Sequence, residues 1–254
     1  MGRWSARLAP RFLDFCQVDD PRRLIDVGCG TGVLSEAMVA RWPRAEVLGV
    51  DPAADYVAFA RARLGGTGAT FLVGDALALP GPDAAFDGAF ALLILQEFAE
   101  PERLIREMAR LTRPEGTVAA CQWDFVDGMP MLTHFWNAVS AVRPGGDTER
   151  ETTRRGPTGR TTEQSLADLW RTCGLRDIAT TTIGLVQDFA DFEDYWRPFL
   201  SGATPTSTYA AGLPPKVQAA LRDELRGRLL GDGPDRPFSL TALALAVRGR
   251  VPAG

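Results

Sequence analysis

The feature that constrains this chain most is the stretch at residues 24–32, where an apolar run reaches an acid and then breaks into glycines. Gly28, Gly30 and Gly32 stand at alternate positions, and a helical pattern begins near Val33. This order predicts a buried strand, a tight turn and the N-terminus of a helix. Glycine permits the unusual dihedral angles of such a turn and lets a ligand approach the backbone. Because the free N–H groups of the helix end point the same way, we expect a ligand over this turn.

The spacing of the glycines distinguishes between the ligands that such turns hold. A dinucleotide fingerprint requires its third glycine at position 33, which is Val33, and no Lys-Ser/Thr pair follows as a P-loop would require. The run Leu-Ile-Asp-Val-Gly-Cys-Gly-Thr-Gly resembles motif I of the class I S-adenosylmethionine (SAM)-dependent methyltransferases. The resemblance implies that SAM is the cofactor. The motif residues expected to bind it are Asp26, Gly28, Cys29, Gly30 and Gly32.

Two further acids follow predicted strands. Asp51 ends the run at residues 46–51, where an α/β nucleoside site places a carboxylate to accept hydrogen bonds from ribose hydroxyls. Asp51 also fits the N-cap of the next helix with Pro52 at N1, and the two roles are compatible, so both residues are candidates for the cofactor site. Asp75 follows the strand predicted at residues 69–73. The resemblance assigns Asp75 to the adenine amino group and the Ala76 N–H to the ring; the alternative is an ordinary turn aspartate.

The methionine end of the cofactor has its own candidates. Residues 86–95 are nearly all apolar, as expected of a parallel strand covered on both faces. The end of this run, from Ala91 to Gln96, resembles motif IV, whose backbone faces the methionine part of SAM. Trp4 precedes Leu8, Phe12 and Phe15, the helically spaced apolar residues of the stretch 3–16, and is a candidate to cover the ligand; an ordinary packing helix is the alternative.

Five strand–helix alternations and a final strand–helix–strand pattern predict a doubly wound, Rossmann-like α/β fold with a mostly parallel sheet. The predicted strands lie at residues 23–27, 46–51, 69–73, 86–95, 117–123, 177–186 and 239–248. The resemblance implies seven strands, the last of them antiparallel. We expect a single domain over residues 1–254, with residues 1–20 as an N-terminal helical cap. Residues 125–162 and 189–236 are expected to be lid insertions whose aromatic residues line an apolar acceptor pocket or form ordinary core.

Composition narrows the class of protein. A net charge of −4 over 254 residues gives no long-range attraction to nucleic acid or to an anionic membrane surface. The four cysteines are widely spaced and His134 is the single histidine, so we expect neither a disulfide framework nor a metal site. Residues 1–10 lack the apolar core of a signal peptide, and the apolar run at residues 89–95 is too short to cross a bilayer. The sequence therefore predicts a cytoplasmic protein and leaves the oligomeric state open.

The rate of methyl transfer depends more on the alignment of the two reactants than on catalytic side chains. A general base is needed only when the acceptor holds its proton at neutral pH. The candidates for that base are His134, Glu97 and Asp124, each of which equally fits a structural or surface role.

The predicted function is SAM-dependent methyl transfer to a small, partly apolar organic acceptor at oxygen, nitrogen or carbon. One alternative is the same fold with SAM bound but no methyl transferred, as in a cyclase or isomerase. Another is a non-catalytic SAM-binding subunit. An enzyme that uses NAD or a nucleotide sugar is disfavoured by Val33.

Overall fold

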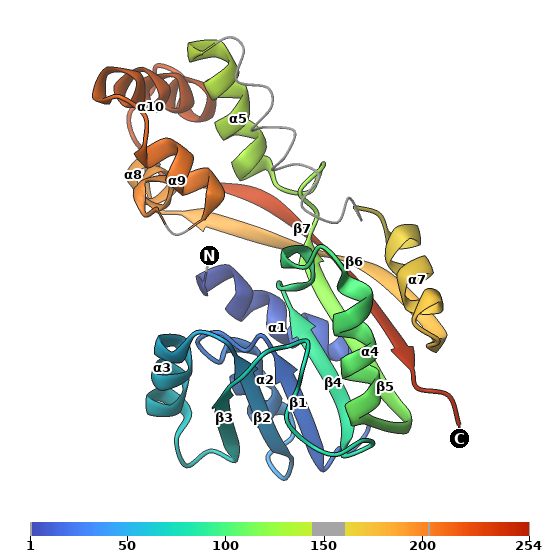
Figure 1. The fold of residues 1–254 in the computed structure, drawn as a ribbon. Coiled ribbons are helices and arrows are strands. Elements are labelled where there is room, and N and C mark those ends of the chain that lie inside the picture. The colour runs from blue at the N-terminus through green and yellow to red at the C-terminus, as the bar shows by residue number, and fades with distance from the viewer. Residues whose placement is uncertain (1, 144–160, 203, 254) are drawn as a thin grey trace. The chain divides into compact units, whose positions relative to one another are not determined.

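The fold is built on a seven-stranded sheet with the strand order β3-β2-β1-β4-β5-β7-β6 (Figure 1). A computed structural model describes residues 2–143, 161–202 and 204–253. Neighbouring strands from β3 to β5 are parallel, and β7 runs antiparallel to β5. The predicted doubly wound, mostly parallel sheet with an antiparallel last strand is confirmed. No helix in the described part of the chain is long and apolar enough to cross a membrane.

The strands lie close to the predicted positions. Their bounds are β1 Arg23–Val27, β2 Glu46–Asp51, β3 Ala69–Val73, β4 Phe86–Leu92, β5 Thr112–Trp123, β6 Arg176–Phe189 and β7 Phe238–Arg250. The strand β5 begins five residues earlier than predicted, because Thr112 already pairs with Phe86 before an irregularity shifts the register to the pair Gly88 and Thr117. A bulge of this kind leaves no simple alternation in the sequence.

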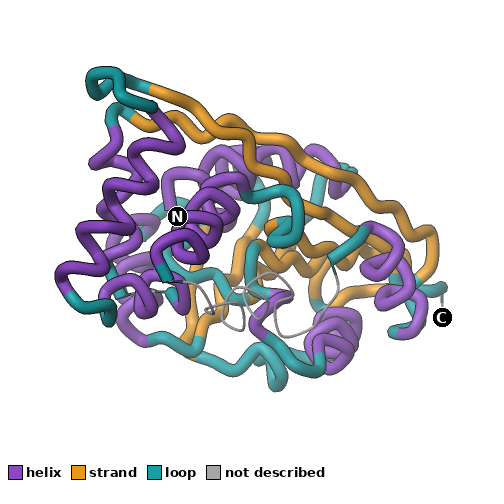
Figure 2. The backbone as a smooth tube through the Cα atoms, turned by 90° about the horizontal axis from the view of Figure 1, so that it is seen from above, coloured by secondary structure: helices purple, strands orange, loops and turns teal. Residues whose placement is uncertain are grey.

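The chain divides into two compact units. Among the described residues, the first unit contains 2–123, 161–183 and 244–253, and the second contains 124–143, 184–202 and 204–243. Helices of the first unit are α1 Gly2–Cys16, α2 Val33–Arg41, α3 Ala54–Leu64, η1 Leu95–Glu97, α4 Pro101–Leu111 and α7 Glu163–Thr172. Helices of the second unit are α5 Pro130–Val142, α8 Phe192–Trp196, η2 Arg197–Leu200, α9 Pro205–Ala211 and α10 Pro215–Leu230. Figure 2 draws the helices of the chain in purple and the strands in orange.

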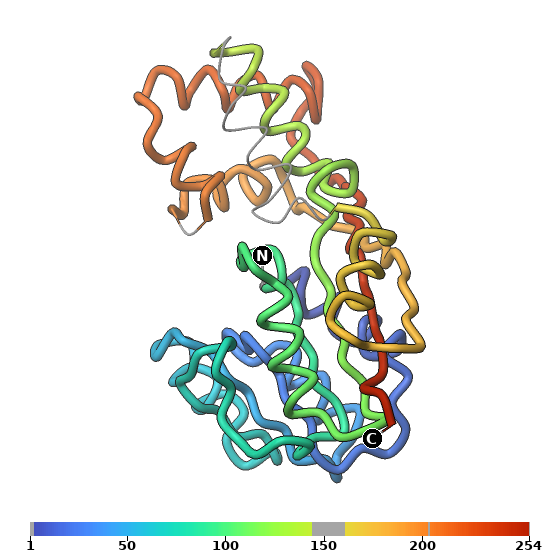
Figure 3. The backbone as a smooth tube through the Cα atoms, turned by 45° about the vertical axis from the view of Figure 1, so that its right-hand side comes forward, coloured from blue at the N-terminus to red at the C-terminus, as the bar shows by residue number. Residues whose placement is uncertain are grey.

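The first unit is layered around the sheet. The helices α1 and α2 cover one face, and α4 covers the other with α7 beside it (Figure 1). Trp170 of α7 is fully buried, and its indole N–H donates to the Val118 carbonyl oxygen of β5 at 3.0 Å. The end of β7 lies beside the start of β5, where the Val251 N–H donates to the Gly116 carbonyl oxygen (Figure 3). Helices thus form both outer layers, but the β3–β4 connection at residues 74–85 contains none.

Aromatic side chains of the second unit pack on one another. Phe135 stacks on Phe199 with ring centroids 4.5 Å apart, and Phe189 stacks on Phe238 at 5.1 Å. Phe135, Phe189 and Phe199 are buried. These contacts favour the core alternative for the aromatic insertions. The two lid insertions themselves, of which residues 144–160 and 203 lie outside the described chain, stay a prediction.

Asp87 joins the starts of three strands of the first unit. Its Oδ2 accepts the backbone N–H groups of Arg22 and Arg23 at 2.7 and 2.9 Å, and its Oδ1 accepts the Arg113 Nε–H at 2.7 Å. Partial burial raises the pKa of Asp87, but the hydrogen bonds from Arg113, Arg23 and Arg22 outweigh it and hold the pKa below its ordinary value. The carboxylate therefore stabilises the fold at neutral pH.

We expect Asp87→Ala to lower the free energy of unfolding by about 2–3 kcal/mol, because two backbone N–H groups lose their acceptor. Since the folded pKa is depressed, the contribution of Asp87 is present above the unfolded pKa and is lost as the pH falls through the folded value. Urea denaturation at pH 7 and at acid pH measures both effects. Glu46→Gln is the matched control, because it breaks the exposed pair with Arg23 at the same sheet end and should cost less than about 0.5 kcal/mol. Equal losses in the two variants would contradict this account.

Candidate functional site

The glycine turn between β1 and α2 has the backbone that its sequence predicts. Gly28, Gly30 and Gly32 have φ values of +70°, +51° and +81°, in the left-handed region that glycine adopts without a Cβ penalty. The Gly28 N–H donates to the Val50 carbonyl oxygen at 2.8 Å, which ties the turn to β2. The turn therefore lies at the carboxyl edge of the sheet, where open α/β sheets bind ligands.

The glycines differ in what surrounds them. A Cβ atom on Gly28 would lie 2.6 Å from the Ile94 Cδ1, so this position is needed for close packing against the end of β4. A Cβ on Gly32 would lie 2.9 Å from the Leu64 Cδ1 of α3. No atom lies within 4 Å of a Cβ placed on Gly30. The space over Gly30 is the part of the turn that is open to a ligand.

Asp51 lies directly beside this turn. Its Oδ2 accepts the Gly30 N–H at 2.8 Å and its Oδ1 accepts the Ala53 N–H at 2.9 Å. The side chain is largely buried, with 8% exposed, and each carboxylate oxygen keeps a lone pair for a further donor. The N-cap alternative is wrong, because α3 has Ala53 as its N-cap, and the exposed Pro52 stands before the helix.

Asp26 lies at the end of β1 behind the turn. It is fully buried, and its Oδ2 accepts both the N–H and the hydroxyl of Ser35, at 2.9 and 2.6 Å. Burial raises the pKa of Asp26 to about 7, and the two bonds from Ser35 offset this only in part. Burial and the charges of Asp26 and Asp51 raise the pKa of Cys29 well above its ordinary value, so this thiol stays neutral. Within the described chain the Asp26 Oδ1 has no hydrogen-bond partner.

Asp75 lies at the same sheet edge. The Gly74 N–H donates to the Asp51 carbonyl oxygen at 3.1 Å, so the two acidic segments are adjacent. Asp75 is exposed, and its Oδ1 accepts the Leu77 N–H at 2.8 Å, as in the turn role named as the alternative. This bond leaves the Oδ2 atom available for a ligand. Ala76 is buried, with 6% exposed.

The end of β4 carries the remaining motif positions. Ala91 is fully buried, and Gln96 is 8% exposed. The Gln96 Nε2 donates to the Leu93 carbonyl oxygen at 2.6 Å, whereas its Oε1 is buried without a partner among the described residues. Leu93 has φ +64°, which is strained for a residue with a Cβ. Backbone strain of this kind is concentrated at functional sites.

Three further candidates are Trp4, Glu97 and Asp124. Trp4 is 4% exposed in α1 of the first unit, with the Arg3 guanidinium 4.3 Å from its ring centroid. Glu97 is exposed on η1 of the same unit. Asp124, in the second unit, accepts the Val126 N–H at 3.0 Å and so shapes a turn. The roles assigned to these residues stay predictions.

His134 is half-buried on α5 of the second unit. Burial, and then the charge of Arg228, lowers the pKa of His134 below its ordinary value. The imidazole is therefore neutral at neutral pH, which is the form that a general base requires. Its catalytic role also stays a prediction.

Sequence reasoning missed three residues that shape this edge: Ser35, which holds Asp26; Ile94, which packs on Gly28; and Leu93, with its strained backbone. A serine on the buried face of an apolar helix was the one available signal, and it marks Ser35. Neither Leu93 nor Ile94 carries a signal, because leucine and isoleucine are ordinary at the end of a buried strand.

The residues at this edge fit a nucleoside with a cationic tail. The open space over Gly30 lets a ligand approach the backbone of the turn. The Asp51 carboxylate beside it has free lone pairs that can accept hydrogen bonds from hydroxyl groups. Asp26 and Asp51 are acids that favour positive charge nearby. These carboxylates and the open turn therefore agree with the cofactor predicted from the motif.

Comparisons with known proteins agree with this geometry. Residues 25–120 match the model of the methyltransferase domain family. The chain is 36% identical over 123 residues to a demethylmenaquinone methyltransferase of Thermus thermophilus, which covers 48% of this chain and 54% of that protein. It is 40% identical over 100 residues to a malonyl-[acyl-carrier protein] O-methyltransferase of Methylococcus capsulatus, covering 39% and 36%. The chain thus spans about half the length of the first relative and about a third of the second.

Solved structures share the fold. A Haemonchus contortus phosphoethanolamine N-methyltransferase 2 in complex with SAM has a TM-score of 0.59 at 16% identity, over 97% of this chain and 53% of that one. The [4+2]-cyclase SpnF has a TM-score of 0.55 at 23% identity, over 98% and 81%. At these identities the likeness concerns the fold alone, which is used for more than one chemistry.

Proposed function

Since residues 25–120 match the model of the methyltransferase domain family, we propose that this chain transfers a methyl group from SAM to a small organic acceptor. SAM is the methyl donor of class I methyltransferases. The relatives named above act on acceptors as different as a menaquinone precursor and a malonylated carrier protein, so the family implies no single acceptor. We propose a small and partly apolar one.

The observation that supports the proposal most is the bond from the Gly30 N–H to Asp51. It places a largely buried carboxylate at the end of β2 within reach of a ligand over the glycine turn. A carboxylate there accepts ribose hydroxyls and disfavours a 2′-phosphate. The same bond fixes the carboxylate before the ligand arrives, so little ordering remains to oppose binding.

The chemistry needs few protein groups. SAM supplies a methyl group on a sulfonium, and the sulfur leaves as a neutral thioether. Asp51 and the turn would hold the nucleoside, and Asp26 would favour the positive charge of the methionine end. Alignment of the reactants contributes several kcal/mol, up to about 7–11 kcal/mol in ideal intramolecular cases. Where the acceptor holds its proton, a general base is needed as well, for which His134, Glu97 and Asp124 remain the predicted candidates.

We expect Asp51→Ala to weaken S-adenosylhomocysteine binding about 100-fold, because two charge-assisted hydrogen bonds to the ribose and the anchor of Gly30 are lost together. Isothermal titration calorimetry measures the affinity. Asp55→Ala is the matched control, because it removes an exposed acid from the first turn of α3 and should leave affinity unchanged. Binding of NAD alone by the wild-type protein would refute the proposal.

A second candidate function is non-methylating chemistry with SAM bound, because the same fold also occurs in a [4+2]-cyclase. Incubation with methyl-labelled SAM and a broad metabolite extract separates the two functions. A labelled small-molecule product supports methyl transfer. Tight S-adenosylhomocysteine binding with no labelled product across the extract would support the second function or a non-catalytic SAM-binding subunit.

A further inference from the structure

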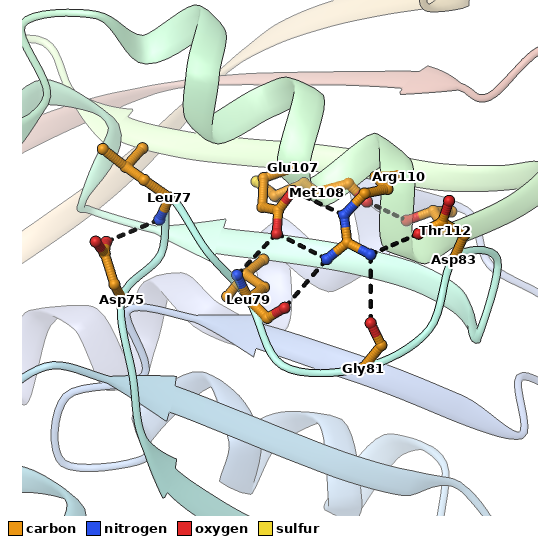
Figure 4. Close-up of polar contacts among 9 residues, drawn as sticks. All are labelled: Asp75, Leu77, Leu79, Gly81, Asp83, Glu107, Met108, Arg110 and Thr112. Carbon is orange, nitrogen blue, oxygen red and sulfur yellow. Dashed lines mark hydrogen bonds and ion pairs between the residues drawn. The ribbon is translucent and has the colours of Figure 1, made fainter.

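The β3–β4 connection is the crossover that lacks a helix between the parallel strands β1 to β5. It runs from Gly74 to Ala85 and begins with Asp75 and Ala76, the two residues proposed to meet the adenine. A loop of this length without secondary structure needs other contacts to have one conformation. Its contacts come from α4 (Figure 4).

Two side chains of α4 hold both polar groups of one loop residue. The Leu79 N–H donates to the Glu107 Oε1 at 2.8 Å, and the Leu79 carbonyl oxygen accepts the Arg110 Nη2–H at 3.1 Å. The Leu79 side chain is also buried, with 4% exposed, in the core beneath α4. The loop is therefore fixed at Leu79 by both its backbone and its side chain.

Arg110 extends this hold along the loop. Its Nη1 donates to the Gly81 carbonyl oxygen at 3.3 Å and to the Asp83 Oδ1 at 2.6 Å. Its Nε and Nη2 donate to the two oxygens of Glu107 at 2.8 and 2.7 Å, which fixes the planar guanidinium (Figure 4). The Arg110 carbonyl oxygen accepts the Ala84 N–H at 2.9 Å. One helical turn thus contacts most of the loop after residue 78.

The loop is held at its other end as well. The Gly74 N–H donates to the Asp51 carbonyl oxygen, and the Ala78 N–H donates to the Asp75 carbonyl oxygen, both at 3.1 Å. Asp75 and Ala76 therefore lie in a short segment fixed on both sides. An ion pair within α4 could stabilise that helix without these bonds. The bonds of Glu107 and Arg110 to both backbone groups of Leu79 therefore act on the loop.

We propose that Glu107 and Arg110 are a positioning pair, which holds the loop that begins at Asp75 and Ala76 in the conformation that receives the adenine end of the cofactor. This inference rests on the proposed function. Both residues lie in the same turn of α4, and they act on that loop through Leu79 rather than by touching the ligand. Loss of the pair should weaken recognition of the base and leave the glycine turn in place.

The test is the affinity for two probes, S-adenosylhomocysteine and S-inosylhomocysteine, which has an oxo group where adenine has its amino group. Wild-type protein should prefer the adenine form at least about 10-fold, because Asp75 accepts from the amino group. Glu107→Ala should weaken S-adenosylhomocysteine binding about 10-fold and reduce that preference toward unity. Glu107→Gln keeps an acceptor for the Leu79 N–H and should recover most of both.

Two further variants separate positioning from stability. Ile105→Val lowers stability from the same helix but leaves the hydrogen bonds of Glu107 and Arg110 to the loop in place, so it should change neither affinity nor preference. Arg110→Lys keeps the charge but loses the planar fork, and should shift both readouts as Glu107→Ala does even if the alanine variant does not fold.

The outcomes are distinct. If Glu107→Ala retains the wild-type preference for the adenine form, the positioning role is overturned and the proposed function stays intact. If Glu107→Ala does not fold, the same conclusion follows when Arg110→Lys retains that preference. Failure of the wild-type protein to bind S-adenosylhomocysteine overturns the proposed function and this inference together.

Discussion

Gly28→Ala is expected to lower the free energy of unfolding by about 2–5 kcal/mol, a large effect for a single methyl group. The left-handed backbone at φ +70° disfavours any Cβ, and the added atom would lie 2.6 Å from the Ile94 Cδ1. The two costs add because the turn is tied to β2 by the Gly28 N–H and cannot relax freely. Urea denaturation of the variant, followed by fluorescence, measures the loss.

Gly30→Ala is the matched comparison. It shares the left-handed backbone, at φ +51°, but its Cβ enters open space, so the expected loss of stability is only about 1–2 kcal/mol. Its affinity for S-adenosylhomocysteine should instead fall about 10- to 100-fold, because the methyl group occupies the space proposed for the cofactor. Equal stability of the two variants would show that the contact with Ile94 has no energetic weight. Unchanged affinity in Gly30→Ala would place the ligand elsewhere.

Replacing Ile94 tests the steric part alone. In the Gly28→Ala background, Ile94→Ala removes the atoms that the new Cβ meets, so part of the lost stability should return. The backbone strain at position 28 remains in the double variant. A double-mutant cycle therefore separates the packing cost from the dihedral cost.

The parts of this fold that sequence predicts are those encoded locally. The glycine turn, the acid at the end of β2 and the order of strands and helices follow from periodicity and from residues adjacent in the chain. The turn at Gly28 and Gly32 could be predicted because few residues other than glycine adopt its left-handed backbone. The packing reason for Gly28 was not predictable, since Ile94 lies far along the chain.

The contacts that hold the site are mostly tertiary, and these were not predicted. Ser35 meets Asp26 across a turn, and Glu107 meets Leu79 over 28 positions of sequence. A glutamate and an arginine three residues apart on a helix are ordinary surface residues by pattern. The position of the helix α5 in the first insertion was not predicted either, because aromatic and β-branched residues there weaken the helical signal.

Asp26 gives the second large effect, a stability that falls as the pH rises. The ordinary value of its pKa is 3.8, and burial raises it to about 7 in the folded protein. Between these values the unfolded chain has lost the proton and the folded chain keeps it, so each rise in pH favours unfolding. The contribution is fully present below the unfolded pKa and lost as the pH passes about 7, with a ceiling of about 4 kcal/mol.

Asp26→Asn is the control for this titration. The amide keeps an oxygen that accepts the N–H and hydroxyl of Ser35 but carries no titrating proton. Its free energy of unfolding should therefore lack the decline between pH 4 and 8, once the common background of the other groups is subtracted. If the wild-type free energy of unfolding ran parallel to that of Asp26→Asn between pH 4 and 8, folding would not raise the pKa of Asp26.

The same carboxyl group should couple cofactor binding to proton release. A cationic methionine end near Asp26 favours the ionised carboxylate, so binding at pH 6.5 should release a fraction of a proton that the free protein holds. Calorimetry in two buffers of different ionisation enthalpy counts that proton. We expect release in the wild-type protein and none in Asp26→Asn, with more release for SAM than for S-adenosylhomocysteine because the sulfonium adds a second positive charge. Equal release in both proteins would mean that the proton comes from a group other than Asp26, and that the cationic end of the ligand does not approach the end of β1.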